Sequence, residues 1–157
     1  SVTGLYNRMG YQKLSISYFT IMREKKMPVL VMFIDLDRLK YINDTFGHEY
    51  GDFAIISIAK AMLKHCDADA IAARTGGDEF IVLEGAKDEE SGRVLAQKIR
   101  TELSKAQRSM QLPFDLSASI GAVVAHPGEE NVLESYVKRA EMLMYEEKAE
   151  KKVSRDS

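Results

Sequence analysis

The sequence has few of the features that define several classes of protein. A single cysteine, Cys66, cannot form an internal disulfide and fits a reducing compartment. The histidines are His48, His65 and His126, too scattered in sequence to suggest a zinc site. The formal net charge of -2 offers no basic field, so no nucleic-acid partner is expected. The longest apolar run, residues 29–34, is too short to cross a bilayer. We therefore expect a cytoplasmic domain, whose parent protein can still be membrane-anchored.

Length and composition are those of an ordinary folded domain. The chain has 157 residues, of which 45% are hydrophobic and 29% are charged. A chain of this size can bury roughly 70% of the surface that it exposes when unfolded. We expect a single domain over residues 1–157. Its opening sequence, Ser-Val-Thr-Gly without an initiator Met, suggests a piece excised from a larger protein.

Hydrophobic periodicity predicts helices that alternate with short strands. The predicted helices cover residues 7–27, 37–43, 48–65, 88–107 and 131–151, and the predicted strands cover residues 29–36, 70–75, 80–84 and 114–124. Mixed hairpin and crossover connections favour an α+β fold, with helices flanking a mostly antiparallel central sheet. Between the second and third strands, Gly76 and Gly77 suit a tight hairpin turn that needs positive φ.

Two finer predictions concern helix faces and caps. The apolar face of the first helix is expected to contain Tyr11, Leu14, Tyr18, Ile21 and Met22, which fall near one side at helical spacing. The helix at residues 37–43 is expected to be capped by Asp37 or by a neighbouring residue.

Three carboxylates are expected to meet at one edge of the sheet. Asp35 ends the first strand, and Asp78 and Glu79 follow the second. A right-handed crossover would make these strands parallel, so their carboxyl ends share an edge. Taken alone, Asp35 is more often a helix cap than a ligand, and Asp78 and Glu79 beside a turn are more often solvated polar residues. Converging carboxylates need a counter-cation, however, and two Mg2+ ions can activate a hydroxyl and stabilise a leaving phosphate. This is the chemistry of nucleotidyl transfer.

Five motifs resemble one known family. The stretch Arg74-Thr-Gly-Gly-Asp-Glu-Phe80 looks like the signature of the GGDEF family, the diguanylate cyclases. Four further segments resemble family motifs in order and spacing: TGLYNR at residues 3–8, DLDRLKYIND at 35–44, GHEYGD at 47–52 and SIG at 119–121. The resemblance covers nearly the whole chain, and five ordered motifs make chance agreement very improbable.

The resemblance implies a reaction and a metal site. The family condenses two GTP into cyclic di-GMP and releases two pyrophosphates, on a ferredoxin-like fold similar to the palm of adenylyl cyclases and polymerases. By resemblance, Asp35 and Asp78 hold Mg2+ or Mn2+, and the Leu36 carbonyl adds an oxygen. Glu79 is expected to be a further metal ligand. Either Asp78 or Glu79 is expected to deprotonate the ribose hydroxyl, and the sequence does not decide between them.

The resemblance also implies how guanine is read. Asn43 and Asp52 are expected to bind the base, since a carboxylate can accept from both the ring N–H and the exocyclic amine of guanine. Their alternative role is that of ordinary cap or turn residues. His48 is expected either to touch the base or ribose or to support the turn.

The remaining substrate contacts involve phosphates. Lys40 is expected to meet the triphosphate, and the bare turn at Gly76 and Gly77 lets phosphates approach the backbone. Lys148 and Lys152, four apart on one helix face, match positions where the family carries Lys and Arg. Their alternative role is a solvated basic helix end.

The sequence departs from the family pattern at several positions. Leu39 replaces a usual Phe, Lys151 stands where Gly is common, and Lys152 replaces a common Arg. An ammonium lacks the bidentate fork of a guanidinium, so phosphate affinity is expected to be weaker. The segment at residues 67–70 lacks the arginine of the inhibitory R-x-x-D motif, which puts direct product inhibition in doubt.

Two rival functions stay open. The chain can be a catalytically silent GTP-binding regulatory domain of a larger cyclic di-GMP signalling protein, with a sensor or phosphodiesterase attached. It can also make mixed or adenine-containing cyclic dinucleotides, although Asp52 suits guanine. For the lead function, one domain offers one apparent GTP site, so we expect catalysis at a transient head-to-head homodimer.

Overall fold

The computed structural model describes residues 3–156, so the domain limits expected at residues 1 and 157 lie outside the described residues. Its helices are α1 (Arg8–Glu24), α2 (Leu39–Phe46), α3 (His48–His65), α4 (Ser91–Ser109) and α5 (Leu133–Asp156). Its strands are β1 (Val29–Leu36), β2 (Ile71–Arg74), β3 (Glu79–Gly85) and β4 (Ala118–Ala125). Within residues 3–156, no helix is both long and apolar enough to span a bilayer.

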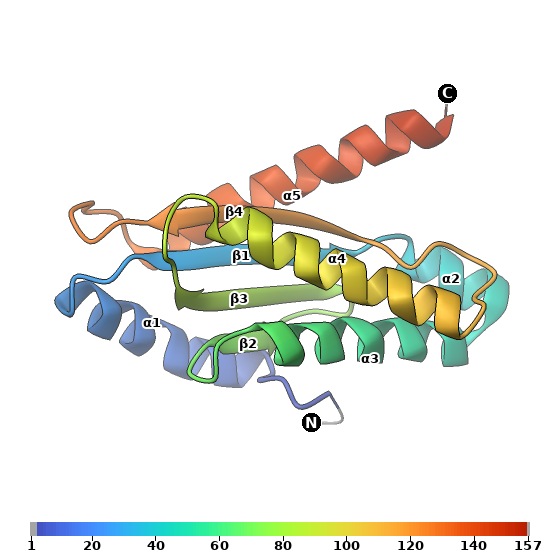
Figure 1. Ribbon diagram of the computed structural model, residues 1–157, viewed down its shortest axis with the longest axis horizontal. Helices are drawn as coiled ribbons and strands as arrows, with labels where there is room; N and C mark the ends of the chain where they lie inside the picture. The colour runs from blue at the N-terminus through green and yellow to red at the C-terminus, as the bar shows by residue number, and fades with distance from the viewer. Residues whose placement is uncertain (1–2, 157) are drawn as a thin grey trace.

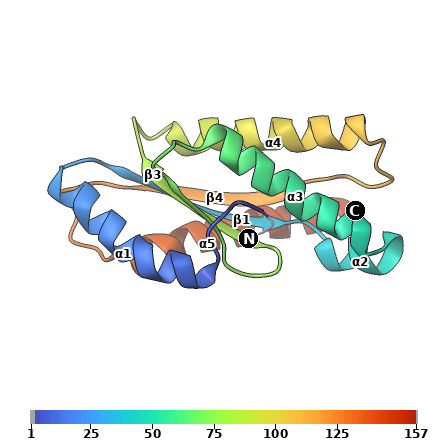
Figure 2. The same cartoon turned by 90° about the horizontal axis from the view of Figure 1, so that it is seen from below.

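The strands form one antiparallel sheet in the order β2-β3-β1-β4. Helices α3 and α4 cover one face, and α1 and α5 cover the other (Figures 1 and 2). Strand β1 is buried along its whole length because it lies inside the sheet and both of its faces are covered. The predicted α+β fold with a mostly antiparallel sheet is confirmed.

The direction of the strands brings the expected edge together. Strands β1 and β2 run the same way because each is antiparallel to β3, which lies between them. Asp35 is therefore the register partner of Glu79, and the Leu36 N–H donates to the Asp78 carbonyl at 2.9 Å. The end of β1 and the β2–β3 hairpin thus share one edge of the sheet.

The apolar face predicted for α1 is wrong in part. Ser15, Phe19 and Met22 are buried, whereas Leu14 is 41% exposed and Ile21 is 49% exposed. Only one narrow stripe of α1 meets the sheet, because the strand beneath it is the short edge strand β2, so residues that flank the stripe stay in solvent.

The predicted cap of α2 is also wrong. Arg38 occupies the cap position in a left-handed conformation with φ 58 and makes no side-chain cap bond. The Asp37 carboxylate is turned away from the helix and bonds instead to Ser117 and Ser119.

Strand β4 begins only at Ala118, because the chain before it closes onto α4 through a Leu116 N–H bond to Gln107 at 2.9 Å.

Backbone groups are hydrogen-bonded at both edges of the sheet. At the β2 edge, the Tyr6 N–H donates to the Ala72 carbonyl at 3.0 Å, and the Tyr6 carbonyl accepts from the Arg74 N–H at 2.8 Å. At the β4 edge, Glu147 accepts from the Ile120 N–H and Lys151 donates to the Ala118 carbonyl, while α5 itself packs on the face of β4 (Figure 1). Gly121 permits this close approach, since a Cβ there would lie 2.0 Å from the Ala140 carbonyl oxygen.

Candidate active site

The centre of the candidate site is the buried carboxylate of Asp35. It is only 7% exposed, and it points to the α5 side of the sheet because it alternates with the buried residues of the opposite face along β1. Its Oδ1 atom has no hydrogen-bond partner, and the Lys148 Nζ lies 3.5 Å from it. A buried carboxylate oxygen without a donor is unfavourable, so this atom is suited to a cation.

Asp78 lies within hydrogen-bonding reach of Asp35. Burial and the charge of Asp78, opposed by Lys148, together raise the pKa of Asp35 to about 7. A carboxylate with this pKa beside a second carboxylate takes up either a proton or a metal ion near neutral pH. The pair therefore fits a hard divalent cation, with the Leu36 backbone beside it.

Glu79 does not join the two aspartates closely. Its carboxylate lies across Gly76, where a Cβ would be 3.0 Å from Glu79 Oε2. Burial raises the pKa of Glu79, and the charges of Asp78 and Glu141 add to the effect. Within the part of the chain that the structure describes, no three acidic, His or Cys side chains converge into a metal-binding group.

The glycine hairpin differs from the predicted turn. Among the described glycines, Gly4 and Gly47 have positive φ, whereas Gly76 and Gly77 do not. The connection spans four residues, 75–78, and is closed by a Thr75 N–H bond to the Glu79 carbonyl at 3.0 Å, so the mirror-image turn of a two-residue hairpin is not needed. The two glycines matter for their missing side chains, which leave open space at Gly77.

The candidate guanine readers meet where α2 gives way to α3. A Cβ on Gly51 would lie 1.7 Å from Asn43 Oδ1, so the Asn43 side chain rests directly on the Gly51 backbone. Asp52 follows on α3 and is exposed, as is His48 at the start of that helix. Within residues 3–156, no hydrogen bond or ion pair links this group to the Asp35 edge.

The candidate phosphate ligands lie on two helices. Lys148 and Lys152 line an open cavity of about 310 Å³ beside the Asp35 edge, and Lys40 lies exposed on α2. Two further cationic residues line the same cavity, Arg38 and Arg155, and no motif in the sequence pointed to them. Their signal was weak, since a lone arginine at a loop or at a helix end is usually only solvated.

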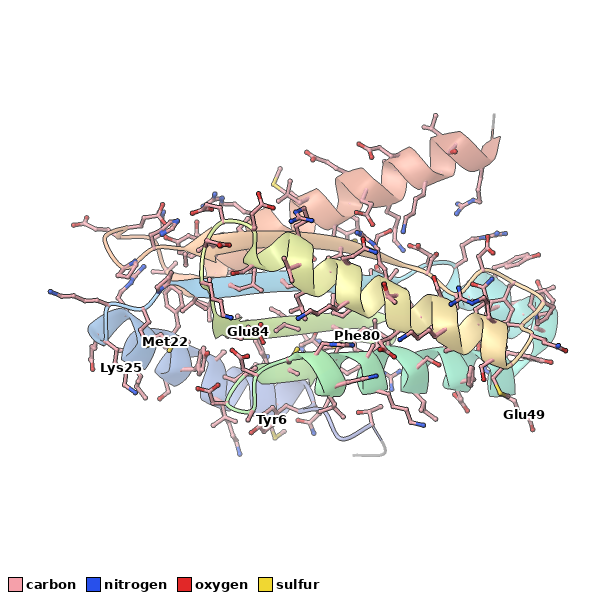
Figure 3. All side chains as sticks on the ribbon, viewed as in Figure 1. Tyr6, Met22, Lys25, Glu49, Phe80 and Glu84 are labelled. Atoms are coloured by element: carbon pink, nitrogen blue, oxygen red, sulfur yellow. The ribbon has the colours of Figure 1, made fainter. Side chains whose placement is uncertain are left out.

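The segment that replaces the inhibitory motif is acidic. Asp67 and Asp69 are exposed, and the Asp67 N–H donates to the buried Glu84 carboxylate at 2.9 Å. Burial raises the pKa of Glu84, while the Asp67 N–H bond opposes the rise. Glu84 and Phe80 lie toward opposite ends of β3 (Figure 3), so this surface is far from the candidate site. An anionic dinucleotide finds no basic partner among these side chains.

Comparison with known proteins assigns the chain to a family. Residues 1–154 match the family model described as diguanylate cyclase, GGDEF domain. The chain is 34% identical over 152 residues to diguanylate cyclase VdcA of Vibrio cholerae, an alignment covering 94% of the chain and 43% of that protein. It is 32% identical over 155 residues to diguanylate cyclase DgcP of Escherichia coli, covering 96% and 44%. The chain thus spans less than half of these relatives.

A further relative and the solved structures extend the comparison. Cyclic di-GMP phosphodiesterase PdeR of Escherichia coli is 32% identical over 145 residues, covering 92% of the chain and 22% of that protein. The GGDEF domain of Caulobacter crescentus DgcB, solved with c-di-GMP, superposes with a TM-score of 0.79 at 27% identity and covers 95% of this chain and 88% of that one. The GGDEF domain of Pseudomonas aeruginosa YfiN gives 0.78 at 28% identity, covering 94% and 92%. The chain belongs to the GGDEF family of diguanylate cyclase domains.

Proposed function

We propose that this domain condenses two GTP molecules into cyclic di-GMP and releases two pyrophosphates. The observation that carries the proposal is the buried Asp35 carboxylate, which has an oxygen without a hydrogen bond, a neighbouring Asp78 and a lysine-lined cavity beside it. A nucleotidyl transfer needs a cation site next to a phosphate site, and these groups supply the side chains for both.

The chain's own residues divide the chemistry as follows. Asp35 and Asp78 would hold Mg2+ or Mn2+, with the Leu36 carbonyl as a further oxygen and Glu79 as a further ligand if its side chain turns from Gly76. The bound ion would supply charge stabilisation to the reacting phosphate. Either Asp78 or Glu79 takes the proton of the ribose hydroxyl.

Two groups of side chains would bind the substrate: one at the junction of α2 and α3, and the lysines of α2 and α5. Asn43 and Asp52 accept the guanine donors, and His48 lies within the same turn. Lys148, Lys152 and Lys40 meet the triphosphate, whose β- and γ-phosphates leave as pyrophosphate. Gly76 and Gly77 leave room for phosphates to approach the hairpin backbone.

The proposal also includes a homodimer and a longer parent chain. Two domains would meet head to head as a homodimer, each holding one GTP. The parent chain would carry other domains, a sensor or a phosphodiesterase, since the curated relatives are much longer than this chain. A GTP-consuming reaction is consistent with a cytoplasmic location.

The decisive experiment is an assay of the chain with GTP and Mg2+, with the products identified by mass. We expect cyclic di-GMP and two equivalents of pyrophosphate. GTP binding without pyrophosphate release would instead favour the silent regulatory domain, a reading to which the phosphodiesterase-named relative gives some support. Recovery of an adenine-containing product from a GTP and ATP mixture would favour the mixed cyclase.

Replacing Asp52 tests guanine recognition. We expect Asp52→Ala to leave guanine donors unpaired and to weaken GTP binding by about 1–3 kcal/mol, with much less effect on residual ATP binding. Titration calorimetry with both nucleotides measures the difference. Equal loss for GTP and ATP would show that Asp52 does not read the base.

Replacing Gly51 tests Asn43 without changing it. The new Cβ of Gly51→Ala would lie 1.7 Å from Asn43 Oδ1, so the Asn43 side chain must leave its position. We expect GTP affinity to fall by about tenfold or more. Gly128→Ala is the matched control, because its Cβ meets no atom within 4 Å. An unchanged GTP affinity in a folded Gly51→Ala protein would remove Asn43 from the site.

A further inference from the structure

The turn of α5 that carries Lys148 is fixed by its neighbour Lys151. The Lys151 Nζ donates to Asp37 Oδ2 at 2.7 Å and to the Ala118 carbonyl at 2.7 Å, and it lies 3.4 Å from Glu147 Oε1. These contacts join α5 to the β1–α2 junction and to the start of β4. All of them are made to the protein itself.

Asp37 is built to receive this lysine. Its side chain is 7% exposed, and it also accepts from Ser119 Oγ at 2.6 Å and from Ser117 Oγ at 2.7 Å. The bonds from Lys151 and the two serines occupy both carboxylate oxygens of Asp37. A buried ionised carboxylate requires a nearby cation, and Lys151 makes the shortest ion pair with it.

A second clamp holds the same turn from the other side. The Arg100 Nη2 atom of α4 donates to both carboxylate oxygens of Glu147, at 2.6 and 2.8 Å. Glu147 Oε1 also accepts from the Ile120 N–H at 3.3 Å. Residues 147–151 of α5 are therefore tied to α4, to β4 and to Asp37 at once.

Lys148 lies within residues 147–151 of α5, so the contacts that hold this turn also position Lys148. Its Nζ is 3.5 Å from Asp35 Oδ1 and 3.8 Å from Asp37 Oδ1. We propose that Lys151 is a positioning residue, which sets the position of α5 so that Lys148 and Lys152 face the nucleotide phosphates. This inference rests on the proposed function.

Lys151→Met tests the inference, because it keeps the length of the side chain and removes its charge. We expect faster amide hydrogen exchange across residues 146–153, GTP affinity about tenfold weaker, and a raised KM with kcat changed much less. Lys151→Arg should restore both exchange and affinity, since a guanidinium can still bind Asp37 and the Ala118 carbonyl. Lys138→Met is the control, since it removes an exposed lysine paired with Glu134 on the same helix.

The double variant Asp37→Asn with Lys151→Met separates positioning from stability. It leaves no unpaired buried charge, so thermal stability should largely recover while GTP affinity stays low. Full recovery of both stability and affinity would overturn the inference, as would unchanged exchange of residues 146–153 in Lys151→Met. If the unaltered chain binds no GTP, the proposed function fails, and the exchange data alone still decide whether Lys151 fixes α5.

Discussion

Asp35→Asn should abolish cyclic di-GMP synthesis and at the same time make the folded chain more stable. Activity should fall about a hundredfold or more, because an amide is a poor ligand for Mg2+ beside Asp78. Stability should rise because the ionised Asp35 carboxylate is buried, lacks a hydrogen bond at Oδ1 and faces Asp78. The gain should be on the order of 1–3 kcal/mol in the absence of metal.

The pH dependence of this gain follows from the pKa of Asp35, which is raised from 3.8 to about 7. A raised pKa means that the folded state holds the proton more tightly, so folding stability falls as pH rises from about 4 to about 7. Asparagine removes that fall. Thermal unfolding in EDTA should therefore show a larger gain at pH 8 than at pH 5.

Two controls make the result specific. Asp115→Asn changes an exposed carboxylate and should leave thermal unfolding nearly unchanged at both pH values. Mg2+ should raise the unfolding temperature of the unaltered chain but not that of Asp35→Asn, because only the former binds the ion. Retained synthesis in Asp35→Asn would remove this carboxylate from the chemistry.

The second large effect concerns protein concentration. Cyclic di-GMP contains two guanylates joined by two phosphodiester links, so each ribose hydroxyl must attack the α-phosphate of the other GTP. If each domain holds one GTP, product formation requires two domains to meet with their Gly76 and Gly77 hairpins opposed. In dilute solution the rate should therefore rise with about the square of enzyme concentration, and specific activity should rise in proportion to it.

Fusing a dimerising coiled coil before residue 1 should raise activity at low concentration by increasing the effective concentration of one domain near the other. Product assays across a wide dilution series, with sedimentation on the same samples, measure both effects. A fusion carrying Asp35→Asn in both chains is the control for nonspecific gains. Constant specific activity from a strictly monomeric species would exclude the head-to-head mechanism.

The arrangement of the sheet edge could be predicted from the sequence, because it follows from the direction of the strands. Once the crossover after β1 made β1 and β2 run the same way, Asp35 had to come near the hairpin, and it pairs in register with Glu79. The face of α1 was predicted less well, since Leu14 has the right spacing for burial but only a short strand lies beneath the helix. Periodicity records which residues share a side and not how much of that side is covered.

Other features of the site depend on contacts that no local pattern contains. Lys151 and Asp37 are 114 residues apart, and their bond depends on how far α5 runs back along β4 toward the start of that strand. The direction of the Glu79 side chain across Gly76 depends on rotamers within a four-residue loop, which sequence spacing does not determine. The sequence was enough to predict which residues belong to the site. The contacts between those residues could be seen only in the folded structure.

The hydrogen-bonded backbone groups at the edges of the sheet affect how the chain behaves at high protein concentration. An open edge strand offers unpaired N–H and carbonyl groups that can template aggregation between molecules. Here Tyr6 occupies such groups on β2, and Glu147 and Lys151 occupy the Ile120 N–H and the Ala118 carbonyl on β4. Strand addition is therefore blocked at those positions on both flanks. The chain should therefore resist aggregation by strand pairing at high protein concentration.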